Sequence, residues 1–271
     1  MKICGFNHGL FGDSIISTVA CRVVKELYPD SELTFALSKS YGSILPLFQN
    51  HPHIDKFHIW NGGETGLVQS DVDYIKENKF DIVFDPFPKH SRPDWYNHTH
   101  YSNECLKMHG LPMTHDLQCY LNPYFYKEDK DNNYVVITAF PSNGTNLTKT
   151  LTVEKWNQIV DFIHKLGYKT IQLGGHRDIA LNNTERPELD WLSAAKILYF
   201  SKLQITADTG WSQIGSAYEH NILGLYSCNY PDMINPFSHM PVNPNSKYLW
   251  RRNIQDIPMD EILTNIEEKL K

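Results

Sequence analysis

The chain has 271 residues, 41% hydrophobic and 21% charged, and a formal net charge of −6. This composition predicts a soluble globular protein that is long enough for two modest domains. The negative charge argues against a nucleic-acid partner, and no apolar run approaches the roughly 18 residues that a membrane-spanning helix needs.

The cysteines and the first residues of the chain indicate the cellular compartment of the protein. The five cysteines are an odd number, lie far apart and include no Cys-x-x-Cys pair, which suits reduced thiols. Residues 1–5 run directly into a strand-like segment without a signal-peptide pattern. We therefore expect a cytoplasmic protein.

The chain opens as a strand, a glycine-containing loop and a helix. The strand covers Lys2 to Phe6, and apolar residues follow helical spacing from Ser14 until Pro29. Asp13 stands at the start of this helix. A carboxylate there can cap the helix, or it can point into a ligand crevice at the carboxyl end of a parallel strand.

The remainder of the first half is less regular. A helix is expected over residues 67–76 and a strand over 80–84, followed by a polar and aromatic stretch at 89–101 that suits sugar recognition. His98, His100, Cys105 and His109 have the side chains of metal ligands, but their spacing matches no closed zinc pattern. We expect neither a metal nor another cofactor.

A linker at residues 122–133 precedes a second α/β half. It contains a strand at 134–140, a helix at 153–166 and a strand at 169–173 that ends in Gly174-Gly175. The helix should bury Trp156, Ile159, Val160 and Ile163. The stretch from Asp178 to Trp191 is short and polar. The chain ends in a capped amphipathic helix at 258–271.

The most informative segment follows the apolar strand at residues 203–207. Asp208-Thr209-Gly210 ends this strand, and a small-residue helix and a second apolar run at 222–226 come next. Thr209 and Gly210 stand where the helix begins, and unpaired N–H groups there can bind phosphate. The structural alternative is that Asp208 caps the helix and Gly210 permits the turn.

Three motifs resemble those of heptosyltransferase-like glycosyltransferases, family nine. Asp208-Thr209-Gly210 resembles their donor-site motif, and Gly12-Asp13 before a helix and a Tyr28-Pro29-Asp30 turn resembles their opening. Lys149, seven residues before the helical Trp156, is the third. The resemblance implies a GT-B fold, which is α/β with two Rossmann-like domains whose parallel sheets face a cleft. We expect an acceptor-side domain at 1–128, a donor domain at 129–256 and a helix at 257–271 packing across them.

The resemblance also implies inverting, metal-independent transfer of a hexose or heptose-like sugar from a nucleotide-diphosphate sugar. The acceptor is a glycan, a lipid-linked sugar or another hydroxyl compound. In such enzymes the carboxylate matching Asp13 is the general base, and the lysine matching Lys149 contacts the donor. The donor and phosphate residues implied here are Lys149, Asp208, Thr209, Gly210, Gln213, Gly174 and Gly175. Gly12, His8 and Trp95 are assigned to the acceptor side.

Two residues depart from the family pattern. Gln213 replaces a histidine, so it can donate a hydrogen bond to phosphate but cannot carry charge. Trp211 replaces a smaller aliphatic residue. Three alternatives stay open: a nucleotide-sugar hydrolase, a non-catalytic nucleotide-binding protein, and a DNA-modifying glycosyltransferase, against which the acidic charge counts.

Overall fold

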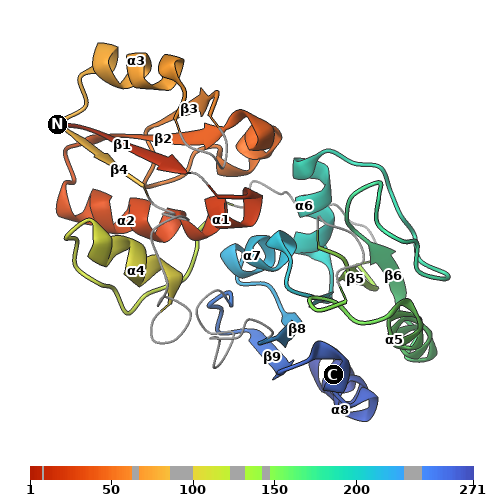
Figure 1. Cartoon of the computed structure of the whole chain (residues 1–271). Helices are drawn as coiled ribbons and strands as arrows, with labels where there is room; N and C mark the ends of the chain where they lie inside the picture. The colour runs from red at the N-terminus through yellow and green to blue at the C-terminus, as the bar shows by residue number, and fades with distance from the viewer. Residues whose placement is uncertain (8, 63–66, 86–99, 123–131, 142–146, 229–239) are drawn as a thin grey trace. The chain divides into compact units, whose positions relative to one another are not determined.

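The protein is described here by a computed structural model covering residues 1–7, 9–62, 67–85, 100–122, 132–141, 147–228 and 240–271 (Figure 1). The chain forms two compact units, with Met1–Asn122 in the first and the described residues after them in the second. Among the described residues, no helix combines the length and the apolar character that crossing a membrane requires.

The first unit contains a four-stranded parallel sheet in the order β3-β2-β1-β4. Its elements are β1 (Lys2–Asn7), α1 (Phe11–Ile16), α2 (Thr18–Leu27), β2 (Glu32–Ser38), the 3₁₀ segment η1 (Lys39–Phe48), β3 (Lys56–Trp60), α3 (Gln69–Asn78), β4 (Ile82–Phe84) and α4 (Tyr101–Met108). The central strands β1 and β2 are almost entirely buried, as continuous apolar runs in a parallel sheet predict.

The second unit contains a five-stranded parallel sheet in the order β6-β5-β7-β8-β9. Its elements are β5 (Tyr134–Thr138), α5 (Val153–Lys165), β6 (Lys169–Gln172), α6 (Trp191–Phe200), β7 (Leu203–Thr206), α7 (Gly210–Ala217), β8 (Ile222–Ser227), β9 (Ser246–Arg251), the 3₁₀ turn η3 (Ile254–Asp256) and α8 (Met259–Leu270). The predicted α/β class with two parallel sheets is confirmed.

Two helices cover the core of this second sheet. Helix α5 buries Trp156, Ile159, Val160 and Ile163, as its periodicity predicted. Helix α8, which we expected to pack across the domains, buries Ile262 and Ile266 in this unit's own core and lies beside α5 (Figure 1).

The short polar stretch after β6 retains only a remnant of strand structure. Glu185 forms an isolated parallel bridge with Ile171 of β6. The side-chain amide of Gln172, 3% exposed, donates to Ile179 O at 2.8 Å and accepts from Leu181 N at 2.9 Å. This buried amide therefore fixes residues 179–181 against the end of β6, and backbone bonds of Glu185 to Thr170 and Gln172 hold the later part.

Candidate active site at the carboxyl edge of the second sheet

Two of the predicted donor residues, Lys149 and Asp208, form an ion pair. Their Nζ and Oδ2 atoms lie 2.9 Å apart, with side-chain exposures of 31% and 19%. Lys149 lies on the loop after β5, and Asp208 follows β7. Because β5 and β7 are parallel neighbours, both residues lie at the carboxyl edge of the sheet, where open α/β sheets bind ligands.

The Lys149 loop is tied to the buried helix α5. The Trp156 indole Nε1–H donates to Thr150 Oγ1 at 2.9 Å, and Thr150 Oγ1 donates to Ala139 O at 2.5 Å. Trp156 and Thr150 are both fully buried. The spacing between lysine and tryptophan therefore has a physical basis, since the indole orients the residue next to Lys149.

A second support comes from η3. The Gln255 side chain donates to Leu147 O at 3.1 Å and to Thr150 O at 2.7 Å, and it accepts from Thr152 N at 3.3 Å. The Ser227 hydroxyl at the end of β8 also donates to the carbonyl oxygen of Thr148. Sequence reasoning missed both residues, because neither carries a motif and both act across long stretches of chain.

Helix α7 begins at the Asp208-Thr209-Gly210 turn. Thr209 is the N-cap residue with extended backbone (φ −134°, ψ 159°), and its side chain makes no capping hydrogen bond. The first backbone N–H groups of a helix have no intrahelical partners, so they suit an anion. Gln213 lies in the first turn of α7 and is only 5% exposed, so its side chain is largely enclosed by the protein.

Buried polar groups fix α7 on the sheet. Tyr226 OH donates to Ser212 Oγ at 2.9 Å, and Ser212 Oγ donates to Thr209 O at 2.6 Å. Gln204 Nε2 donates to Trp211 O at 3.1 Å. Burial, together with the nearby negative charge of Asp208, raises the pKa of Tyr226 well above 10, so its hydroxyl stays a neutral donor. A hydrogen-bond chain thus runs from β8 to the Asp208-Thr209-Gly210 turn.

Trp211, the departure from the family pattern, has a stacking partner. Its ring and that of Trp191, the first residue of α6, have centroids 4.9 Å apart at an interplanar angle of 30°. Trp211 is 8% exposed. The added bulk therefore packs α6 against α7, which are also in contact.

Gly174 and Gly175 lie at the same edge, after β6. Gly175 N donates to Asp178 Oδ2 at 2.9 Å, and Asp178 N donates back to Gly175 O at 3.0 Å. A Cβ on Gly174 would lie 2.0 Å from Asp178 Oδ2, so a larger residue here would displace the Asp178 carboxylate from this position. Burial raises the pKa of Asp178, and the Gly175 N–H, Arg186 and His176 oppose that effect.

Asp13 belongs to the first unit and is the third residue of α1. Its Oδ2 accepts a hydrogen bond from Leu10 N at 2.7 Å, and the side chain is half-buried. The adjacent loop is ordered by Asn7, whose Oδ1 accepts from Gly9 N at 2.9 Å. Gly12 is buried beside Asp13. His8 and Trp95, also assigned to the acceptor side, lie outside the described residues.

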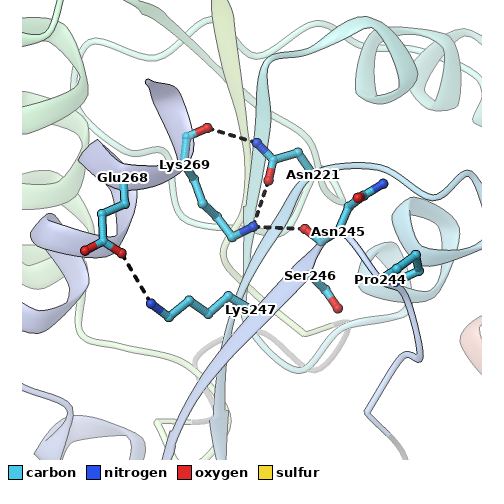
Figure 2. Close-up of a pocket in the computed structure, with 7 residues that line it drawn as sticks. All are labelled: Asn221, Pro244, Asn245, Ser246, Lys247, Glu268 and Lys269. Carbon is cyan, nitrogen blue, oxygen red and sulfur yellow. Dashed lines mark hydrogen bonds and ion pairs between the residues drawn. The ribbon is translucent and has the colours of Figure 1, made fainter.

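A shallow depression of about 540 Å³ lies elsewhere, at the amino ends of β8 and β9 (Figure 2). Lys269 Nζ donates there to Asn221 Oδ1 at 2.8 Å and to Asn245 O at 2.9 Å. Lys247 pairs with Glu268 at 3.3 Å. Burial and the positive charge of Lys247 lower the pKa of Lys269. None of the predicted site residues lines this depression.

The described part of the chain contains no group of three or more His, Cys, Asp or Glu side chains that could hold a metal ion. Of the histidines considered above, His109 contacts the backbone of Asp85 through Nε2, 3.0 Å from Asp85 O. His98 lies outside the described residues.

No protein-family model matches the chain, and no curated protein sequence matches it. Solved structures do. A family-nine glycosyl transferase from Veillonella parvula DSM 2008 has a TM-score of 0.74 at 16% identity, with 99% of this chain and 97% of that chain covered. The chain has the GT-B fold of these transferases. The resemblance predicted from the motifs is confirmed at the level of the fold.

Two further solved structures match nearly the whole chain. The E. coli heptosyltransferase WaaC with ADP has a TM-score of 0.66 at 13% identity, with 99% of this chain and 100% of that chain covered. The iron-containing dodecameric glycosyltransferase TibC from enterotoxigenic E. coli has a TM-score of 0.69 at 13% identity, with 99% of this chain and 75% of that chain covered.

Proposed function

We propose that this protein is a glycosyltransferase that moves a sugar from a nucleotide-diphosphate sugar to a hydroxyl acceptor with inversion. The observation that carries the proposal is the Lys149–Asp208 ion pair beside the start of α7, on a chain with the GT-B fold. An ammonium and a helix N-terminus at one sheet edge suit the departure of a diphosphate.

In the proposed reaction the acceptor oxygen attacks the anomeric carbon of the donor sugar. The bond from that carbon to the diphosphate oxygen breaks, and its electron pair leaves with the nucleoside diphosphate. The Asp13 carboxylate takes the proton of the acceptor hydroxyl. Thr209 and Gly210 offer backbone N–H groups to the diphosphate, and Lys149 offsets the charge that develops on it.

Asp208 has a positioning role in this proposal. A carboxylate is a poor partner for phosphate, and here it directs the Lys149 ammonium toward the start of α7. Gly174 and Gly175 form the adjacent turn of the donor side. Gln213, which is largely enclosed, contributes through the packing of α7 rather than as a charged phosphate ligand.

The donor to test first is ADP-heptose, since TibC was solved with ADP-D-beta-D-heptose and WaaC with ADP. We propose that transfer needs no metal, because Lys149 provides the positive charge at the leaving group. TibC contains iron, so the assay is run with and without a chelator. Equal turnover in both is the expected result.

The deciding experiment follows release of the nucleoside diphosphate by chromatography and mass spectrometry, with and without candidate acceptors. Asp13→Asn preserves an acceptor for Leu10 N and should lower turnover by about 10²-fold or more without changing donor affinity. Asp73→Asn, an exposed carboxylate on α3, is the matched control. Unchanged turnover in Asp13→Asn contradicts the assignment of the base. Release that is independent of every acceptor indicates a hydrolase.

A further inference from the structure

The turn after β6 carries two arginines and a histidine that the proposed reaction does not use. His176 and Arg177 are the central residues of the Gly175–Asp178 turn, and both are exposed. Arg186 lies alongside, with Nη2 3.4 Å from Gly175 O. Arg186 and His176 are also close enough to Asp178 to oppose the rise of its pKa.

Hydrogen bonds hold the backbone of this turn in place. Asp178 accepts the Gly175 N–H, and the buried Gln172 amide bonds the backbone of Ile179 and Leu181 just beyond it. Ordering long charged side chains on binding costs entropy. A backbone that is already hydrogen-bonded lowers the part of this cost that comes from the main chain, which favours recognition of an anion.

Two acidic side chains nearby are engaged by backbone donors. Asp178 is 9% exposed and turned inward onto Gly175 N. Asp190 caps α6 by accepting from Ser193 N at 2.8 Å. Glu185 and Arg186 are consecutive residues of an extended segment, so their side chains point to opposite faces. The exposed Arg177 and Arg186 thus carry two positive charges, against one negative charge from the exposed Glu188, two residues after Arg186.

The charges at the carboxyl edge of the sheet suggest a role for His176, Arg177 and Arg186. Lys149 is the cation at the start of α7, where it also pairs with Asp208. Gln213 is neutral, so a single ammonium faces the several negative charges of a diphosphate there. In the sheet order β6-β5-β7, the basic turn lies two strands from Asp208, roughly 10 Å away, on the same carboxyl edge.

We propose that His176, Arg177 and Arg186 form a second anion-binding subsite that takes a phosphate group of the substrates. The inference rests on the proposed function for its ligand, but the anion binding itself can be measured independently. Arginine suits this role because its planar guanidinium can donate two parallel hydrogen bonds to phosphate oxygens.

The test is isothermal titration of the full chain with inorganic pyrophosphate at low salt. Arg177→Gln and Arg186→Gln should each weaken binding at least threefold, and the double variant at least tenfold. Lys169→Gln is the matched control, because it removes one exposed positive charge from the other end of β6. It should change affinity by less than twofold. Since these side chains are exposed, thermal midpoints should stay near that of the unaltered chain.

Equal weakening in all variants, or weak binding without saturation, means that the charges only attract ions non-specifically and overturns the proposal. Loss of binding in Lys149→Ala alone also overturns it. Repeating the titration with a saturating nucleoside diphosphate identifies the source of the phosphate. Competition assigns the subsite to the donor, and persistent arginine-dependent binding assigns it to a phosphorylated acceptor. Arginine-dependent pyrophosphate binding without any nucleotide binding supports the subsite while contradicting the proposed donor.

Discussion

Replacing Gln255 with methionine should loosen the Lys149 loop from a position 105 residues beyond Thr150. Methionine keeps the length of the side chain but cannot make the three hydrogen bonds to Leu147 O, Thr150 O and Thr152 N. Each is worth about 0.5–1.5 kcal/mol net. Because parts of the loop remain in contact with water, the lower half of the sum applies, about 2 kcal/mol.

This loss should lower the thermal midpoint of the second unit by about 4–8 °C. Differential scanning calorimetry measures it, with Gln69→Met as the matched control, since the exposed Gln69 side chain bonds Asp73 within its own helix α3. Nucleotide affinity should fall together with stability, because Lys149 loses its fixed position. A Gln255→Met variant that melts with the unaltered chain and binds nucleotide equally well refutes the reasoning that η3 supports the site.

Two further predictions concern buried groups in each unit. Gly215→Ala places a Cβ 2.0 Å from Gln204 Oε1 and should lower the free energy of unfolding in urea by about 2–3 kcal/mol. Adding Gln204→Ala should restore part of this loss. A Gly215→Ala variant as stable as the unaltered chain contradicts the close packing at this position. Burial lowers the pKa of His51 from 6.5 to about 4, so folding requires the neutral ring, and stability should fall by about 3 kcal/mol as pH drops from 6.5 to 4. His51→Gln should flatten this dependence and the exposed His115→Gln should not; equal slopes in both contradict the assignment.

Hydrophobic pattern and turn chemistry predicted most of the sheet elements. Strands of parallel sheets are buried on both faces, so β1, β5, β7 and β8 appear in the sequence as mostly apolar runs. The edge strand β9 was missed. Its sequence Ser-Lys-Tyr-Leu-Trp-Arg is half charged or polar, because only one residue of it is buried.

The candidate site was predictable residue by residue but not as an arrangement. Asp208, Thr209 and Gly210 follow from a strand that ends where a helix begins, which is a local pattern. The ion pair of Lys149 with Asp208 joins positions 59 residues apart, and the sequence contains no record of which side chains meet across parallel strands. The sequence shows Tyr226 only as the end of an apolar strand, although its hydroxyl bonds Ser212, which in turn bonds Thr209 O at the start of α7.

The basic turn shows the same limit. His176, Arg177 and Arg186 are separated by up to ten positions and looked like ordinary polar loop residues in the sequence. Arg186 reaches this turn by bonding Gly175 O, in a stretch of chain whose backbone is bonded by the buried Gln172 amide and where Asp178 packs over Gly174. These are tertiary contacts that the spacing of residues along the sequence does not predict.

The central claim is that the carboxyl edge of the second sheet binds a nucleotide diphosphate through Lys149 and the start of α7. Isothermal titration of ADP, UDP, GDP and their sugar conjugates, with CMP as a monophosphate control, into the full chain and into Lys149→Met tests it most directly. We predict that one nucleoside diphosphate binds with micromolar affinity and that the variant weakens it at least tenfold. Absence of binding for every nucleotide at millimolar concentration, or identical affinity in the variant, contradicts the account.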